Sequence, residues 1–187
     1  MRLTPAMERY VLHWGEMGAR WGVNRSVAQI HALLYLAPHP LTAEEIADTL
    51  AIARSNVSMS LKELLAWGLV RRAPVRGDRR DHFEALRDNW EIVTRIVEER
   101  KRREVDPTLS ILRACAMEAA SDGQTAAETR QRIEGLLEFL ETLSQWYDQV
   151  KNLPKPVLVG LMKMGGRVAR FAPRGRGAGK RRAGGEE

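Results

Sequence analysis

Apolar residues recur every three or four positions along most of the chain, a pattern typical of helices with one buried face. In the N-terminal part, this spacing predicts a helix over residues 4–21. A second helix is expected to begin at Ser26, because Ser26 and Gln29 have the spacing of a capping box. Pro38 then ends this helix, since proline cannot continue the backbone hydrogen bonding.

The C-terminal half shows the same helical period. Apolar stripes predict helices over residues 88–103, 107–120, 124–150 and 156–171. The pair Asp106-Pro107 is expected to separate the helices over 88–103 and 107–120, because proline favours the first position of a new helix. The region from 172 onward is rich in Gly and Arg, and its composition favours disorder.

The pattern changes between residues 42 and 85. A second capping box, Thr42 with Glu45, opens a short helix. The turn Ala51-Ile52-Ala53 leads into another helix over 54–67, which Gly68 ends. Two short segments, 69–74 and 81–85, have the character of strands and flank the polar tip 76–80, which predicts a β-hairpin. The predicted fold class is therefore mainly α, a winged helix-turn-helix with a short β-hairpin wing and a helical dimerisation region.

The helix over 54–67 separates its side chains into two faces. Its core-facing residues are Val57, Leu61, Leu64 and Leu65. Its open face is left with Arg54, Ser55, Asn56, Ser58, Met59 and Lys62. Hydroxyl and amide groups can read base edges in the major groove, and Arg or Lys can bond guanine or phosphate. This face contains no carboxylate, which indicates a recognition helix for double-stranded DNA.

Overall basicity adds little to this interpretation. Residues 151–187 contain ten Lys or Arg against two Glu, a net charge of +8. The whole chain carries +6, so residues 1–150 carry −2. The local pattern matters more, because seven Lys or Arg lie between Arg54 and Arg80 against Glu63 and Asp78.

The stretch LTAEEIADTLAIARSNVSMSLKELLAWGLVRR, followed by GDRRDHFEA, resembles the winged-helix domain of the MarR superfamily. The preceding WGVNRSVAQIHALLYL is similar to the GbsR-like branch, and the resemblance covers about residues 8–105. It implies that the DNA-reading end of the recognition helix comprises Arg54, Ser55, Asn56 and Ser58. It also implies that Arg80 enters the minor groove, where the negative potential favours arginine, and that Asp78 braces it. Thr42 at the helix cap and Arg79 in the wing complete the expected DNA-binding residues.

Three positions depart from the family pattern. Ala51 stands where the turn commonly has Gly, and Ala53 where many relatives have a capping Ser. His82 replaces a common second wing arginine, so the wing carries one permanent charge fewer.

The predicted helices over 88–103 and 124–150 carry apolar stripes that need a partner. Proteins with a winged helix-turn-helix of this kind usually bind DNA as two-fold dimers. A homodimer is therefore expected. The candidate seam residues are Leu136, Leu137, Leu140, Leu143 and Val150.

Aromatic residues suggest an effector site. A cage for a choline-like osmolyte would use Trp14, Trp21, Trp146 and Tyr147. The alternative is that these aromatics are ordinary core residues. Cys115 is expected to be a buried structural thiol, and the four histidines show no metal-ligand spacing. No cofactor is expected, and the chain lacks the catalytic motifs of an enzyme.

The sequence thus predicts a cytoplasmic, ligand-responsive, dimeric repressor that binds specific DNA and makes no membrane contact. Its expected parts are supporting helices (1–37), the DNA-binding domain (38–87), the dimerisation and effector region (88–171) and a basic tail (172–187). Two alternatives remain open: an architectural protein that binds DNA without sequence preference, and a winged helix that binds another protein.

Overall fold

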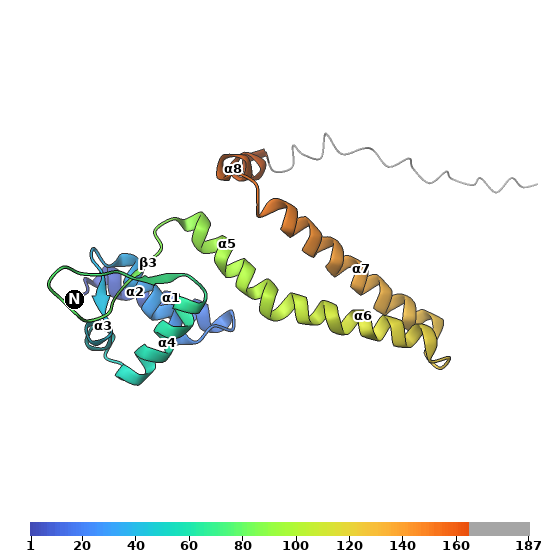
Figure 1. Ribbon diagram of the computed structural model, residues 1–187, viewed down its shortest axis with the longest axis horizontal. Helices are drawn as coiled ribbons and strands as arrows, with labels where there is room; N and C mark the ends of the chain where they lie inside the picture. The colour runs from blue at the N-terminus through green and yellow to red at the C-terminus, as the bar shows by residue number, and fades with distance from the viewer. Residues whose placement is uncertain (165–187) are drawn as a thin grey trace, which may run out of the picture. The chain divides into compact units, whose positions relative to one another are not determined.

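The computed structural model describes residues 1–164, and the expected basic tail lies outside the described residues. The chain divides into two compact units, residues 1–144 and 145–187. The first unit contains a winged helix-turn-helix and an arm of long helices (Figure 1). None of the helices in residues 1–164 is long and apolar enough to cross a membrane.

Four helices make up most of the winged-helix body: α1 (Pro5–Arg20), α2 (Arg25–Leu36), α3 (Ala43–Leu50) and α4 (Arg54–Ala66). Three of these helices have a side-chain cap that accepts a backbone hydrogen bond at the N-terminus. The capping residues are Thr4 for α1, Asn24 for α2 and Thr42 for α3. At Gly18, a Cβ atom would lie 2.5 Å from Ala28 Cβ, so glycine permits the close packing of α1 on α2. The predicted capping box of Thr42 and Glu45 is confirmed.

Three short strands form an antiparallel sheet in the order β1-β3-β2: β1 (Leu41–Thr42), β2 (Val70–Arg72) and β3 (His82–Ala85). Phe83 on β3 pairs with Leu41 on one side and Arg72 on the other. The hairpin is confirmed, whereas β1 was not predicted, because two residues are too few to show an alternating pattern.

The buried core joins these elements. Ile30, Leu33 and Leu34 on α2 are almost fully buried, as are Ile46 on α3 and Leu64 on α4. These side chains form one apolar cluster that also includes β1 and β3. Burial of this cluster fixes α4 on the body and leaves its opposite face open.

The start of α2 differs from the prediction. The cap is Asn24, whose Oδ1 accepts from Ser26 N at 2.8 Å, so the helix begins at Arg25. The predicted capping box of Ser26 and Gln29 is wrong, because Gln29 packs against Gly15 and Ser26 Oγ bonds a residue of α4.

The predicted interruption at Asp106-Pro107 is also wrong. The chain stays helical from α5 (Asn89–Arg100) through a π-helical turn, η1 (Lys101–Val105), into α6 (Asp106–Ser121). The amide of Asp106 donates to Lys101 O, and this wider turn accommodates the proline without a break. Such turns inside long helices are frequent at functional sites.

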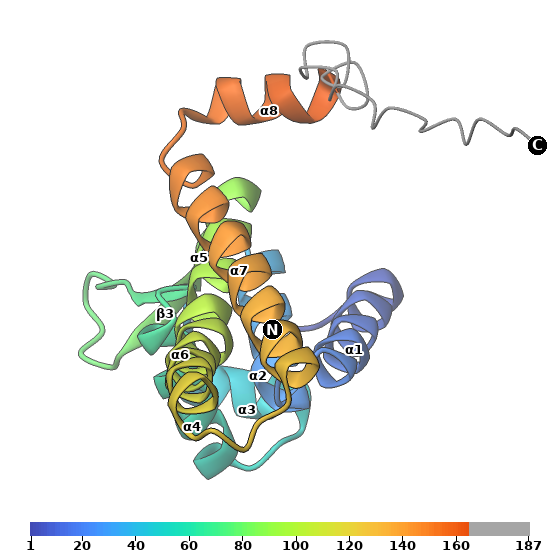
Figure 2. The same cartoon turned by 90° about the vertical axis from the view of Figure 1, so that its right-hand side faces the viewer.

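The arm continues into α7 (Ala127–Val150), and α8 (Lys155–Met164) follows in the second unit. α6 and the first part of α7 run side by side (Figure 1 and Figure 2), with Arg113 Nε 2.8 Å from Glu141 Oε1. Large apolar side chains on this arm remain exposed: Ile111, Met117, Leu136, Phe139 and Leu143. Cys115 on α6 is only partly buried, contrary to the expectation of a buried thiol.

Candidate nucleic-acid interface

The turn between α3 and α4 sets the direction of the predicted recognition helix. Ala51 ends α3 in a left-handed conformation, with φ of 52°. Ala53 caps α4 without a side-chain hydrogen bond, so this cap lacks the acceptor that a serine would supply. The two departures noted in the sequence therefore lie in one three-residue turn.

Most of the predicted reading face is open to solvent. Arg54, Ser55, Ser58 and Lys62 are exposed, and Met59 retains 72% of its surface. The opposite face carries Val57, Leu61 and Leu64 into the core. The helical period thus divides α4 as the sequence predicts.

Asn56 is the exception. Its Nδ2 donates to Ser26 Oγ on α2 at 2.9 Å, and its Oδ1 accepts from Ser60 Oγ at 3.4 Å. The side chain is partly buried and faces α2, so the expectation that it lies on the open face is wrong. The helical period places Asn56 at the border between the two faces, and the hydroxyl of Ser26 draws it inward.

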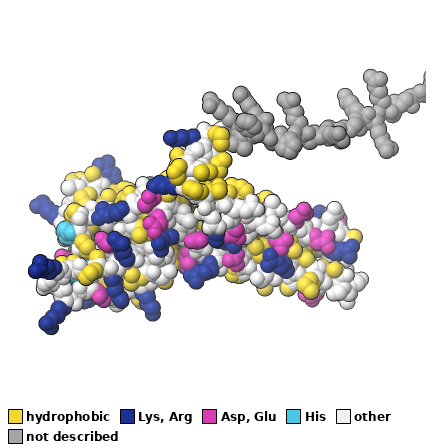
Figure 3. Space-filling view, turned by 45° about the horizontal axis from the view of Figure 1, so that its top comes forward, with side chains coloured by type: hydrophobic (Ala, Val, Ile, Leu, Met, Phe, Trp, Pro, Cys, Tyr) yellow, Lys and Arg dark blue, Asp and Glu magenta, His cyan; other side chains and the backbone are white. Residues whose placement is uncertain are grey.

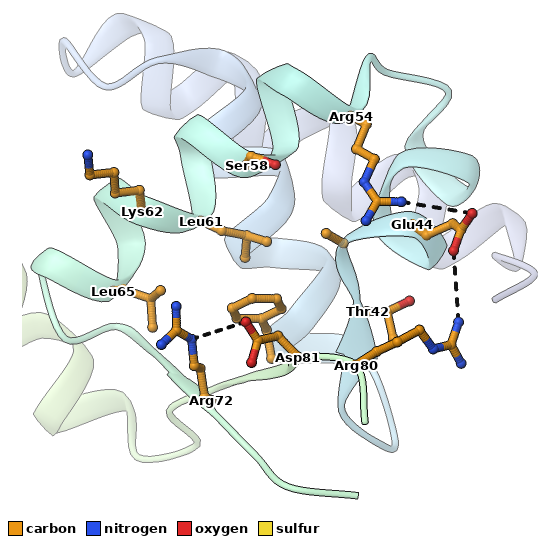
Figure 4. Close-up of a pocket in the computed structure, with 12 residues that line it drawn as sticks. Thr42, Glu44, Arg54, Ser58, Leu61, Lys62, Leu65, Arg72, Arg80 and Asp81 are labelled. Carbon is orange, nitrogen blue, oxygen red and sulfur yellow. Dashed lines mark ion pairs between the residues drawn. The ribbon is translucent and has the colours of Figure 1, made fainter. Parts of the chain in front are cut away.

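A groove of about 550 Å³ separates α4 from the wing (Figure 4). Arg54, Ser58 and Lys62 line one side, and Arg72 and Arg80 line the other. In the close-up, Arg54 and Arg80 point toward Glu44 between them, Arg72 points toward Asp81, and the amine of Lys62 points away from the hollow. Four cations around one groove suit a polyanion.

Glu44 also lines this groove, and the sequence did not indicate it. Its carboxylate lies 3.9 Å from Arg54 Nη1 and 3.8 Å from Arg80 Nη1, so it bridges the helix and the wing (Figure 4). The basic residues counted in the sequence are therefore partly compensated here, because α3 places a carboxylate between the two arginines. Asp81 similarly lies 3.6 Å from Arg72 Nε.

The wing arginine is held by its neighbour. Arg80 Nε donates to both oxygens of Asp78, at 3.1 and 3.0 Å, and the backbone amide of Arg80 donates to the same carboxylate. The side-chain hydrogen bonds from Arg80, followed by the one from its backbone amide, hold the pKa of Asp78 far below its usual range. The same side-chain hydrogen bonds, with the negative charge of Asp78, raise the pKa of Arg80. Both groups are therefore charged at neutral pH. His82 Nε2 lies 3.5 Å from the same carboxylate but is buried.

Two further predicted residues differ in exposure. Arg79 is exposed at the wing. Thr42 is only 2% exposed, and its hydroxyl both donates to Glu45 Oε2 and accepts from Glu45 N. The capping role of Thr42 is thus established, while its contact with DNA stays a prediction.

The four residues of the predicted aromatic cage divide between the two compact units. Trp14 and Trp21 line a small cavity of the first unit, which Trp67 also lines. Trp146 and Tyr147 belong to the second unit, where Trp146 is exposed. Within residues 1–164, no cluster of His, Cys, Asp or Glu is placed to hold a metal ion.

The space-filling view places charge on the visible face. Lys and Arg side chains project around the winged-helix end of the molecule, at the left of Figure 3. Acidic and basic side chains alternate along the helical arm. On this face, basic side chains project furthest at the winged-helix end, where acidic side chains lie between them.

Comparison with known proteins agrees with this geometry. Residues 19–81 match the model of the MarR family. The HTH-type transcriptional repressor GbsR of Bacillus subtilis strain 168 is 24% identical over 147 residues, covering 75% of this chain and 79% of the relative. A solved structure of a transcriptional regulator has a TM-score of 0.62 at 19% identity, covering 79% of this chain and 96% of the other. The predicted family resemblance and fold class are confirmed, and these relatives are regulators rather than enzymes.

Proposed function

We propose that this chain, which carries a MarR-family winged helix, is a cytoplasmic transcriptional regulator that binds specific double-stranded DNA. The N-terminal half of α4 enters the major groove, where Ser55 and Ser58 meet base edges and Arg54 meets guanine or phosphate. Arg80, oriented by Asp78, enters the adjacent minor groove. The observation that carries this proposal is the groove between α4 and the wing, with cations on both sides.

The regulator acts as a homodimer. Apolar side chains exposed along α6 and α7, among them Ile111, Leu136, Phe139 and Leu143, would be covered by a second copy. Two-fold symmetry would then place two recognition helices about one helical turn of DNA, roughly 34 Å, apart. Exposed apolar area of this kind is characteristic of an interface.

Repression relieved by a small ligand is the regulatory mode that we propose. The relative from Bacillus subtilis is named as a repressor. A ligand would act by favouring one spacing of the two recognition helices over another. It can do so only if it binds the dimer more tightly in one of these two spacings. The π-helical turn η1 joins α5, the helix that follows the winged helix, to α6, and it is a suitable hinge.

Fluorescence anisotropy with two duplexes tests this function. The full chain is titrated against its own upstream DNA and a scrambled duplex, each at two salt concentrations. A specific regulator binds the upstream duplex at least tenfold more tightly at both salt concentrations. Equal affinity with a steep salt dependence would instead indicate an architectural DNA-binding protein. No binding to either duplex at low salt would indicate a protein-interaction module.

A further inference from the structure

A small apolar cavity lies beneath the C-terminal half of α4, away from the DNA-facing groove. Its volume is about 80 Å³. Three tryptophans from different parts of the first unit line it: Trp14 on α1, Trp21 at the end of α1 and Trp67 at the end of α4. Aliphatic side chains complete the wall: Val23, Val27, Leu64, Leu69 and Ile96. Trp21 is 61% exposed, so the cavity reaches solvent beside this ring.

A buried polar side chain, His31, lies within this apolar wall. His31 on α2 is 6% exposed, and its Nε2 atom is buried without a hydrogen-bond partner. An unsatisfied buried polar atom destabilises a fold, so such atoms are few in native proteins. Burial lowers the pKa of His31 to about 4, so the ring is neutral at pH 7. A neutral imidazole offers one hydrogen bond at Nε2, as donor or acceptor according to its tautomer.

Charge around the cavity disfavours a cationic ligand. Among residues 1–164, the ionisable residues that line the wall are His31 and Arg100, and no carboxylate of this part of the chain lines it. Arg100 donates to the carbonyl of Trp21 and lies 3.5 Å from Glu104, so its charge is already compensated. Outside the cavity wall, the guanidinium of Arg103 lies 5.8 Å from the ring centroid of Trp67, so this ring already has a cation beside it.

We infer that this cavity binds a small uncharged molecule with an apolar body and one hydroxyl or amide group, which bonds Nε2 of His31. The tryptophan rings supply apolar contact, and the hydrogen bond satisfies the buried Nε2 atom of His31. A dry apolar cavity of about 150 Å³ holds a benzene ring. The cavity here is smaller, so one end of the ligand fills it and the rest extends past Trp21. This site shares Trp14 and Trp21 with the choline cage suggested by the sequence and differs from it in taking an uncharged ligand.

A ligand in this cavity would contact the recognition helix directly. Leu64 and Trp67 lie at the C-terminal end of α4, and Arg100 is the last residue of α5 before η1. A bound molecule therefore contacts both the recognition helix and the root of the arm. This regulatory consequence rests on the proposed function, whereas ligand binding itself does not.

A matched pair of probes tests the inference on the full chain without DNA. 3,3-Dimethylbutan-1-ol and choline have the same shape and hydroxyl group, and they differ in a central carbon against a charged nitrogen. Tryptophan fluorescence is expected to change saturably with the alcohol, at least tenfold more tightly than with choline. Choline binding as tightly as the alcohol, or no saturable change with either probe, would overturn the inference.

Two variants locate the site. His31→Leu removes the hydrogen bond and is expected to weaken binding of the alcohol at least fivefold, while His13→Leu on the exposed face of α1 leaves it unchanged. Because His31→Leu alters the core, Trp21→Ala at the exposed mouth gives an independent test and should also weaken binding. Unchanged affinity in a folded His31→Leu or Trp21→Ala protein contradicts the assignment. DNA titration without ligand tests the proposed function separately.

Discussion

The side-chain amide of Asn56 on α4 donates to the hydroxyl of Ser26 on α2 across 30 positions of sequence, at 2.9 Å. This hydrogen bond fixes the rotation of α4 near its N-terminal end, where the DNA-facing residues begin. Asn56 therefore positions the recognition helix from its inner side, and Ser26 is its partner rather than a helix cap.

Asn56→Ala and Ser26→Ala should each lower the free energy of unfolding by about 1–2 kcal/mol, because each leaves a partly buried polar group without its partner. A double-mutant cycle in urea measures the coupling. If Asn56 acts only through Ser26, both variants weaken operator binding equally. A much larger loss for Asn56→Ala would show that the amide reads a base directly.

Glu44→Gln should strengthen DNA binding about twofold to fivefold. The carboxylate competes with phosphate for Arg54 and Arg80, and an exposed ion pair contributes about 0.2–1 kcal/mol. Asp48→Asn, also exposed on α3, is the control for the loss of one negative charge. Equal gains in both variants, measured by anisotropy at one salt concentration, would show that only net charge matters.

Arg80→Ala should weaken binding to the operator and to a scrambled duplex by similar factors, since a minor-groove arginine contributes little base readout. Asp78→Asn should cause a smaller loss, because the guanidinium keeps its charge but loses its bracing carboxylate. Arg79→Ala measures the contribution of charge alone at the wing. Loss of sequence discrimination in Arg80→Ala would contradict this role for the wing.

Lowering the pH should destabilise the fold through His31. The pKa of His31 is about 4 when folded against 6.5 when unfolded, so between these values the unfolded chain binds the extra proton. The free energy of unfolding is therefore unaffected by this group above pH 6.5 and declines by about 3 kcal/mol as the pH falls to 4. Urea unfolding at pH 7 and pH 5 measures this decline. His31→Leu should reduce the pH dependence, and His13→Leu should leave it as it is.

Ala51→Gly should raise the free energy of unfolding by about 0.5–1 kcal/mol. Ala51 has a φ of 52°, where a Cβ atom is strained and glycine is not. Ala114→Gly within α6 should instead lower the free energy by about 1 kcal/mol, because glycine weakens a helix. Thermal unfolding of the two variants compares these effects, and a lower midpoint for Ala51→Gly would contradict the strain.

Local pattern determined much of the architecture. The period of apolar residues located every helix of the described part, and Gly68 and the pair Thr42 and Glu45 marked helix ends correctly. These features depend on neighbours within about four positions, so the sequence contains them directly. Pro107 predicts a break that the structure does not have, because a π-helical turn has no signature in apolar spacing.

The order of amino acids by itself determined the winged helix-turn-helix and which face of α4 is open, because both follow from the burial of periodic apolar side chains. Only the tertiary structure decided that Glu44 bridges Arg54 and Arg80, that Asn56 turns toward Ser26, and that Trp67 joins Trp14 around His31. These relationships join residues on different elements, whose mutual distances depend on how the helices pack. Polar side chains choose their partners only after that packing has placed them within hydrogen-bonding distance.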